Sequence, residues 1–394
     1  MLRRRGWSIV AALSVTELTS WGVLYYGFPV FLKPMQATFG WSRTTLTGAF
    51  SLALAVQGVT AIAVGRWLDR RSPRALMTAG SVTATALVLA WSRVGSVAAF
   101  YVLWAAIGAV MATVLYEPAF TVVAKWFHAE RTRALTAITL VAALASFVFL
   151  PIENRLLRAY GWRTALVVLA VVLGVVTVPL HALVLRPPPV DGPLQRQPDA
   201  PEPEHSTRDA LGSPAFWYLA AALVGTSFVS SALAVHQVAY LSERGFSTAF
   251  AAGATGVLGA MQLPGRLLFG PLRRRLSRRA TTTVVYLTFT AGLVVLLAGR
   301  GRTSVWVFVA IYGMGRGMTT LLRATLVGDL FGARHYGGIS GVLAALTTVA
   351  VAGSPLAAAG LYDRLGNYDA VLWLLLGVAV AATVAASRIE AGAR

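Results

Sequence analysis

Residues 65–74 read Gly-Arg-Trp-Leu-Asp-Arg-Arg-Ser-Pro-Arg and lie between two long apolar stretches. About 205 residues later, residues 270–279 read Gly-Pro-Leu-Arg-Arg-Arg-Leu-Ser-Arg-Arg and lie between two more apolar stretches. The repeat continues downstream, because residues 125–127, Lys-Trp-Phe, are matched by residues 329–331, Asp-Leu-Phe, at nearly the same spacing. The chain therefore consists of two related halves, and each half places a basic loop between two apolar segments.

The composition indicates that most of the chain lies in lipid. Hydrophobic residues make up 57% of the 394 residues, charged residues make up 12%, and the mean hydropathy is +0.67. One soluble core cannot bury this much apolar surface. The absence of cysteine excludes disulfides, thiolate catalysis and iron-sulfur ligation. The net charge is +19, but the arginines are scattered between apolar segments, which favours a role in membrane topology over nucleic-acid binding.

Hydropathy predicts an all-α integral membrane protein. A helix needs roughly 20 apolar residues to cross about 30 Å of hydrocarbon, and the chain has about twelve such segments. They lie near residues 7–32, 43–65, 75–92, 96–119, 132–153, 163–185, 214–241, 248–271, 280–299, 303–327, 336–361 and 369–387. Most lysines and arginines fall at the termini and in the even-numbered loops, which predicts a multi-pass protein of the cytoplasmic (inner) membrane with both termini cytoplasmic. Five arginines fall on the predicted outer side: Arg155, Arg158, Arg163, Arg300 and Arg302.

One polar segment separates the two halves. Residues 186–213 are rich in proline and charge and contain few large apolar groups, as is typical of a disordered linker. We therefore predict a bundle of six helices at residues 1–185, a cytoplasmic linker at 186–213, and a second bundle of six helices at 214–394.

The first basic loop resembles the signature of the major facilitator superfamily, in which a glycine is followed by three residues, an aspartate, an arginine and further basic residues. Gly65, Asp69, Arg70 and Arg74 match it. The resemblance implies two pseudo-symmetric bundles with a substrate cavity between them and a gating role for this loop. Asp69 can accept hydrogen bonds from a helix N-terminus or pair with an arginine. The second copy departs from the signature, since Arg274 stands where the acid is expected.

The second half resembles the monocarboxylate transporters and the related oxalate/formate exchangers. Three stretches carry the resemblance: Gly-Arg-Leu-Leu-Phe-Gly at 265–270, Asp-Leu-Phe-Gly at 329–332, and Gly-Ser-Pro at 353–355 followed by Asp-Arg-Leu-Gly-Asn-Tyr at 363–368. In that family an arginine four residues before a glycine binds the substrate carboxylate, and Arg266 occupies this position. The resemblance implies a secondary transporter for a small organic anion, a monocarboxylate, by symport with a proton or without one.

The departures from that family concern proton coupling. Its helix 1 lysine falls at Tyr26 and its helix 8 aspartate falls at Gln262, so coupling by that pair is absent. The glycine-proline motif of drug/proton antiporters is not found between Leu140 and Pro151. The missing motif argues against multidrug efflux but does not exclude it.

Several ionisable residues inside the predicted segments have apolar counterparts in the other half, at a spacing of about 205 residues. The pairs are Arg266 with Ala61, Arg316 with Met111, Glu17 with Ala222, and His236 with Phe31. A charge inside the membrane costs several kcal/mol unless it is paired or hydrated, and such groups usually face a cavity. Because the shared scaffold does not require them, these residues are candidates for function.

The two arginines are candidate substrate ligands. A guanidinium holds a carboxylate with two parallel hydrogen bonds, which favours Arg266 as the binding group, and a snorkelling arginine is the alternative. Arg316 lies among glycines at residues 313–317, where it could bind substrate or pair with a buried carboxylate. Tyr25, Tyr26 and Gln262 could line the same cavity or serve as ordinary packing contacts.

Other ionisable groups suggest coupling and gating. Glu17 lies near the middle of helix 1, where it could exchange a proton or form a permanent salt bridge with Arg316. His236 could titrate or be a structural, hydrogen-bonded histidine. Glu117 and Arg323, in corresponding parts of the two halves, could pair as an inner gate or be solvated.

Other chemistry finds little support. No Walker loop, zinc-protease spacing or dinucleotide fingerprint is present, so we predict no metal, no cofactor and no enzyme activity. The expected partners are a small carboxylate, protons and the lipid bilayer, without nucleic acid, and the protein is expected to work as a monomer. Two further functions stay open: efflux of a larger metabolite or drug, and a ligand-sensing receptor built on a transporter scaffold.

Overall fold

The computed structural model describes residues 2–187 and 205–389, nearly all of which are helical, and none of these residues forms a β-strand element. Ten helices among them are long and apolar enough to cross a membrane. Every segment that hydropathy predicts to span is almost entirely helical, either in one helix or in two consecutive helices. Large apolar side chains on the helix surfaces remain exposed, such as Val102 at 72% and Leu356 at 76%, as is typical of helices surrounded by lipid. The predicted all-α membrane fold is confirmed.

Local backbone geometry explains why ten candidates appear where hydropathy gives about twelve segments. The candidate Arg131–Val184 contains two predicted segments, because α7 (Arg131–Ala143) and α8 (Ala145–Pro179) follow each other directly. Within α8, Gly161 has φ 74° and ψ 167°, so α8 is two helices that meet at this glycine. The predicted segment 248–271 is divided instead, because α11 (Thr248–Ala260) and α12 (Gln262–Arg275) are separated by a turn at Met261.

The chain divides into two compact units. Unit 1 comprises Met1–Glu204 and Gly332–Ala345, and unit 2 comprises His205–Phe331 and Leu346–Arg394. Most of the predicted linker lies outside the described residues. Its described C-terminal part contains a short helix, α9 (Thr207–Gly212), which the composition did not predict. Ser206 and Asp209 form a capping box at the start of α9, which explains why a polar segment is helical here.

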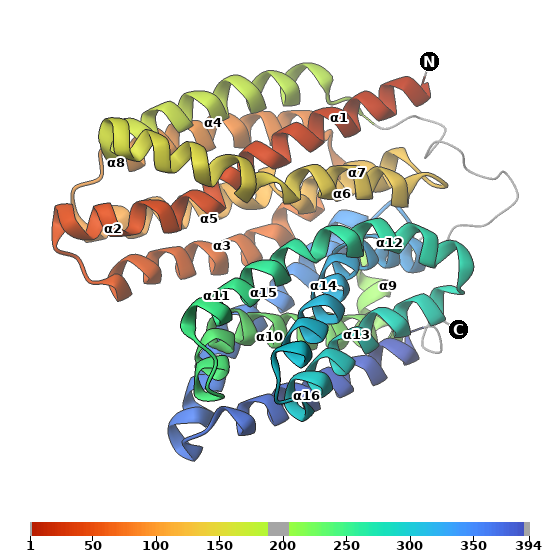
Figure 1. Ribbon diagram of the computed structural model, residues 1–394. Coiled ribbons are helices and arrows are strands. Elements are labelled where there is room, and N and C mark those ends of the chain that lie inside the picture. Colours follow the sequence, from red (N-terminus) through yellow and green to blue (C-terminus); the bar gives the residue numbers. More distant parts are fainter. Residues whose placement is uncertain (1, 188–204, 390–394) are drawn as a thin grey trace, which may run out of the picture. The chain divides into compact units, whose positions relative to one another are not determined.

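The first membrane-crossing helix of unit 1, called helix 1 below, consists of α1, the π-helical turn η1 and α2. Figure 1 labels α1 and α2. The helix pairs that pack together are α3 with α5, α4 with α8, and α1 with α7 and α8. A core rich in aromatic side chains, including Phe28, Trp91 and Trp104, fills the space between them. The elements not yet given bounds are α1 (Leu2–Ser20), η1 (Trp21–Tyr26), α2 (Gly27–Phe39), α3 (Arg43–Arg70), α4 (Pro73–Trp91), α5 (Val97–Val114), α6 (Tyr116–Trp126) and η2 (Leu180–Val184).

Unit 2 has a second core, which contains Tyr240, Phe289, Phe308 and Tyr312. Here α10 packs against α16 and α11, α13 against α14 and α16, and α12 against α14. The remaining helices are α10 (Pro214–Glu243), α13 (Arg278–Ala298), α14 (Arg302–Phe331), α15 (Tyr336–Leu365) and α16 (Tyr368–Arg388). The first residues of α15 belong to unit 1 and the rest to unit 2.

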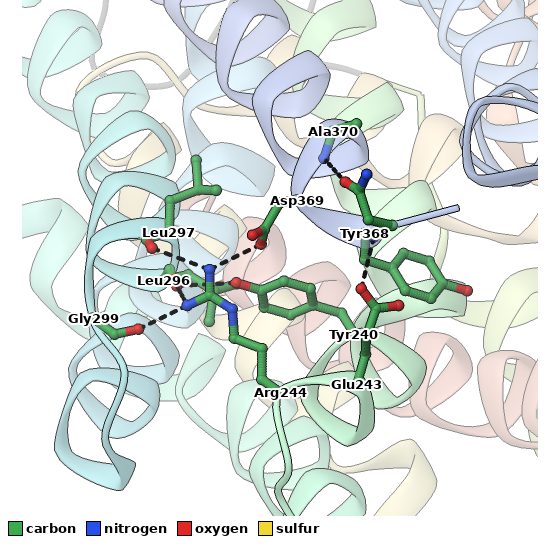
Figure 2. Close-up of polar contacts among 10 residues, drawn as sticks. Tyr240, Glu243, Arg244, Leu296, Leu297, Gly299, Tyr368, Asp369 and Ala370 are labelled. Atoms are coloured by element: carbon green, nitrogen blue, oxygen red, sulfur yellow. Dashed lines mark hydrogen bonds and ion pairs between the residues drawn. The ribbon is translucent and has the colours of Figure 1, made fainter. Parts of the chain in front are cut away.

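One arginine joins three helices at an end of unit 2 (Figure 2). Arg244 follows α10 and donates to the carbonyl oxygens of Leu297 and Gly299 at 3.2 and 2.9 Å. These two carbonyl groups lie at the C-terminal end of α13. It also donates to Oδ1 of Asp369 in the first turn of α16 at 2.9 Å. The side chain therefore caps the last carbonyl groups of one helix and pairs with the acid in the first turn of another.

Unit 1 contains a related arginine on a different helix. Arg163 in α8 donates to the carbonyl oxygens of Ser92 and Val94 after α4, at 2.6 and 3.3 Å, and its guanidinium lies 4.4 Å from the ring centroid of Trp162. Arg163 is one of the arginines on the predicted outer side. Its hydrogen bonds give it a structural role that does not depend on membrane topology.

Candidate functional site

Glu17 is fully buried in α1 and lies beside a cluster of aromatic rings in unit 1. Its Oε2 accepts a hydrogen bond of 3.0 Å from the indole nitrogen of Trp21. The Trp21 ring lies 5.1 Å from Tyr25, 6.5 Å from Tyr26 and 5.0 Å from Tyr116, measured between centroids. Three predicted site residues, Glu17, Tyr25 and Tyr26, therefore meet around one tryptophan.

The aromatic cluster depends on the π-helical turn η1. In this turn the backbone N–H of Gly27 donates to the carbonyl of Gly22, five residues earlier, which is the bonding pattern of a π-helix. A Cβ at Gly22 would overlap the ring of Phe149, so only glycine allows α8 to approach so closely. The sequence analysis did not predict this turn.

Two buried polar residues of unit 1 were missed from the sequence. Glu153 in α8 is fully buried, although it lies at the edge of a predicted segment. His181 in η2 is also fully buried, and its ring nitrogens lie 2.7 Å from Oγ of Ser81 and 3.1 Å from Oγ1 of Thr16. The comparison of the halves could have found Glu153, because Ala358 stands 205 positions later.

In unit 2, Arg266 and Gln262 lie on α12 where that helix crosses α14. A Cβ at Gly265 would overlap the backbone of Met314, and a Cβ at Gly317 would overlap the backbone of Gln262. The helices therefore touch backbone to backbone, as small residues allow in membrane proteins. Arg266 is only 6% exposed, so its guanidinium is held inside the bundle and does not snorkel to a surface.

Arg316 follows the same crossing on α14. Its neighbours Gly315 and Gly317 pack against α13 and α12 respectively, so the arginine stands between two close helix contacts. Arg316 is partly exposed, and no hydrogen bond or ion pair of its guanidinium occurs within the described residues of unit 2. The structure thus brings Gln262, Arg266 and Arg316 to one helix crossing.

His236 and Tyr240 share one face of α10 but have different partners. Nε2 of His236 lies 3.0 Å from the carbonyl oxygen of Pro355, which can only accept, so Nε2 carries the proton. Nδ1 then accepts from the hydroxyl of Tyr368 at 3.2 Å. Tyr240 donates to the carbonyl of Leu296 instead. The histidine links three helices of unit 2 through this network.

Asp69, the acid of the first basic loop, binds the start of α15. Its two carboxylate oxygens accept from the backbone N–H groups of Gly337 and Gly338 at 2.9 and 2.7 Å, all within unit 1. A Cβ at Gly65 would overlap the carbonyl of Gly337, so the glycine permits this approach. Nζ of Lys125 lies 3.7 Å from Oδ1 of Asp69, so the carboxylate also forms an ion pair.

The second basic loop also forms an ion pair, but here the loop supplies the basic residue and the partner is the acid. Arg273 forms a close ion pair with Asp329 within unit 2, and Arg278 donates to the Asp329 carbonyl at 3.2 Å. The distance of 204 positions separates both Asp69 from Arg273 and Lys125 from Asp329. The counterpart of Asp69 is therefore Arg273 and not Arg274, which corrects the sequence alignment by one residue.

A pocket of about 360 Å³ adjoins the first basic loop and is lined by Asp69, Arg70, Arg71 and Lys125, among others. It contains none of the predicted substrate-binding residues. Arg74 lies in the first turn of α4. Glu117 lies in unit 1 and Arg323 in unit 2, and their pairing stays a prediction.

The family model of the Major Facilitator Superfamily matches residues 13–355. The chain belongs to the Major Facilitator Superfamily. It is 25% identical over 347 residues to an oxalate:formate antiporter of Oxalobacter formigenes, which covers 85% of this chain and 80% of the relative. It is 26% identical over 371 residues to monocarboxylate transporter 13 of Bos taurus, covering 93% and 84%.

A further relative and a solved structure also match the chain. A Mycolicibacterium smegmatis protein described as an MFS-type efflux pump is 30% identical over 324 residues, covering 75% of this chain and 68% of that protein. The solved structure of the transporter FucP in its outward conformation has a TM-score of 0.74 at 13% identity, covering 96% and 97%. The chain is thus a multi-pass transporter, and the predicted resemblance to the monocarboxylate and oxalate/formate group is confirmed.

Proposed function

We propose that this superfamily member is a secondary active transporter that moves a small organic carboxylate, a monocarboxylate in our first choice, by alternating access. The single observation that carries the proposal is Arg266, a nearly fully buried guanidinium at the α12–α14 crossing. A buried guanidinium favours an anionic ligand, and a carboxylate matches its two parallel N–H groups. The names of the oxalate:formate antiporter and of monocarboxylate transporter 13 support this class of substrate.

Gln262 and Arg316 are proposed to assist Arg266, since both lie at the same crossing. Tyr25 and Tyr26 stay predicted substrate contacts through the aromatic cluster of unit 1. Glu17 is the proposed proton-coupling group, because it is a buried carboxylate whose only donor in the described part of the chain is the Trp21 indole. His236 stays a second candidate for coupling, although both its nitrogens already have partners.

Asp69, with Gly65, Arg70 and Arg74, is proposed to act as a latch. Its carboxylate caps the buried N-terminus of α15, an interaction that can form and break as the transporter changes state. The location in the cytoplasmic membrane with both termini inside also remains part of the proposal. Reporter fusions to either terminus would test it, because a reporter that is active only outside the cytoplasm should stay silent.

The central test is uptake of labelled formate, acetate, lactate and oxalate by proteoliposomes, with and without an inward proton gradient. We expect saturable uptake of at least one carboxylate, which Arg266→Ala abolishes. Arg266→Lys should restore little, because an ammonium keeps the charge but loses the two-pronged geometry. Arg279→Ala removes an exposed arginine and serves as the matched control, with uptake unchanged.

Failure of every carboxylate with folded protein would reject the proposal. Efflux of a larger metabolite or drug then becomes the leading function, which the relative described as an efflux pump supports. Proton-driven extrusion of fluorescent hydrophobic compounds from inverted vesicles would establish that alternative.

A further inference from the structure

Glu153 is a buried carboxyl group that the proposed transport mechanism does not use. Its side chain has 0% exposure within unit 1. Neither Oε1 nor Oε2 receives a hydrogen bond from any described residue. A carboxylate in this position would carry an uncompensated charge, which costs several kcal/mol in a buried site.

The backbone of helix 1 is shaped to receive this carboxyl group. Gly22 and Gly27 are five residues apart and are joined by the hydrogen bond of the π-helical turn, while Phe149 and Glu153 are four residues apart on α8. Phe149 packs on Gly22, and an added Cβ at Gly27 would lie 3.1 Å from Oε1 of Glu153. The two glycines at the ends of the π-helical turn therefore face two side chains that are one α-helical turn apart on α8. The carboxyl group of Glu153 lies against the backbone of Gly27.

The charged and titratable groups on the packed elements have other positions or partners. Glu17 of α1 accepts from Trp21, Tyr25 and Tyr26 of η1 pack on that tryptophan, and His181 of η2 lies between Ser81 and Thr16. Lys33 of α2 is exposed.

The arginines of these elements lie in the first turns of their helices or are exposed. Arg74 in α4 and Arg131 and Arg133 in α7 all belong to first turns of their helices. On α8 itself, Arg155 and Arg158 are exposed. No described group therefore forms an ion pair with Glu153, and no three His, Asp or Glu side chains gather anywhere in the described residues to hold a metal ion.

We infer that Glu153 is a proton-binding site of the transport cycle, distinct from Glu17. The neutral acid is the form that fits the closed contact with Gly27. When the bundle opens this contact to water, one Oε–H bond breaks and the proton passes to water; re-closure requires that a proton from water binds the carboxylate again. The inference rests on the proposed secondary transport and deepens it by adding Glu153 as a second proton-binding residue beside Glu17.

A spectroscopic test is independent of the substrate. Infrared difference spectra of the purified, reconstituted protein between acidic and alkaline pH report the C=O stretch of protonated carboxylic acids. We expect a band that disappears in Glu153→Gln and persists in Glu17→Gln. A wild-type spectrum in which no carboxylic-acid band depends on Glu153 would overturn the inference, whether or not the protein transports carboxylates.

A transport test separates coupling from substrate binding. Counterflow of a labelled carboxylate needs no net proton movement, whereas accumulation driven by a proton gradient does. Glu153→Gln should keep counterflow and lose gradient-driven accumulation. If the variant accumulates substrate like the wild type, or loses both activities, Glu153 is not the coupling site; if the wild type moves no carboxylate, the proposed substrate fails and the infrared result alone decides.

A second variant guards against misfolding of Glu153→Gln. Gly27→Ala keeps the carboxyl group and places a methyl group 3.1 Å from Oε1. The Glu153 band should shift in frequency, because its surroundings change while its chemistry does not. Gly95→Ala, at a glycine of unit 1 with open space where a Cβ would lie, should leave the band unchanged, and an equal spectrum for all three proteins would contradict the assignment.

Discussion

Trp21 is the residue on which the geometry around Glu17 depends. It donates the hydrogen bond to the buried carboxylate and also packs against three tyrosines. Removing one partner of a buried polar pair costs more than the bond itself contributes, because the remaining group is left desolvated. The indole N–H, and not only the ring, should therefore matter.

Replacing Trp21 by Phe keeps an aromatic ring and removes the N–H. We expect a loss of about 1–3 kcal/mol in the free energy of unfolding, measured by thermal or denaturant unfolding of the purified protein in micelles. Trp373→Phe changes a tryptophan that is 63% exposed and should have little effect. Equal stability of the two variants would show that the Trp21 hydrogen bond contributes nothing.

The sequence identified some of the buried charges and missed others for a physical reason. Glu17 and Arg266 lie deep within apolar segments, so hydropathy and the comparison of halves single them out. Glu153 stands beside Asn154 and Arg155, and a carboxylate at the end of an apolar segment looks like a loop residue. Its burial results from packing of α8 on the bare backbone of helix 1, which no local pattern reveals.

Among the elements, the crossing of α12 and α14 is set by glycine. Gly265 and Gly317 bring the two backbones together beside Arg266, whereas Gly270, in the same helix, has open space where a Cβ would be. Three glycines in two helices thus have different roles, which composition alone cannot distinguish.

Gly265→Ala should force α12 and α14 apart and lower stability by about 1–3 kcal/mol. Gly270→Ala should leave stability unchanged or raise it by up to about 1 kcal/mol, since alanine is the better helix former. Thermal unfolding of the two variants measures how much the close α12–α14 contact contributes to stability. Equal destabilisation by both changes would contradict the role of Gly265 at this crossing.

The short helix α9 should depend on pH through its cap. The side-chain and backbone donors of Ser206 lower the pKa of Asp209 below its ordinary value of 3.8. Because the pKa is lowered, this contribution is present above the ordinary value and is lost as the pH falls through the value in the folded protein. Protection of residues 207–212 from hydrogen exchange should therefore decrease at acidic pH, and Asp209→Asn should remove the pH dependence while leaving the rest of the chain unchanged.

Hydropathy predicted where the helices lie but not where they bend. The turn at Met261, the break at Gly161 and the six-residue π-helical turn after Ser20 are all short, whereas a hydropathy average covers a window of about 11–18 residues. Elements follow from burial summed over many residues, and their interruptions follow from single contacts.

At the scale of the whole molecule, both halves contain an ion pair at corresponding positions, but the acidic and basic residues are exchanged between the halves. Asp69 faces Lys125 in unit 1, while Arg273 faces Asp329 in unit 2. The pairing geometry is therefore common to both halves, although the signs are opposite. Asp69 additionally caps α15, a role that an arginine cannot perform because it has no acceptor.

A charge exchange tests this symmetry. Arg273→Asp alone places two acids together and should destabilise the protein, and adding Asp329→Lys should recover most of the loss. We expect a coupling energy of about 0.5–3 kcal/mol from the double-mutant cycle, measured by unfolding in micelles. Additive effects of the two changes would mean that the pair is not an interaction shared by the halves.

The π-helical turn has a consequence for the length of helix 1. Deleting one residue between Trp21 and Tyr26 would convert the segment to regular α-helix, and each residue of an α-helix accounts for a rotation of about 100°. The direction of Glu17 relative to Gly27 would then change by about that angle. Substitutions within the turn preserve this register, whereas a single-codon deletion would rotate one buried carboxyl site relative to the other, so this stretch of the chain is constrained by its residue count as well as by its side chains.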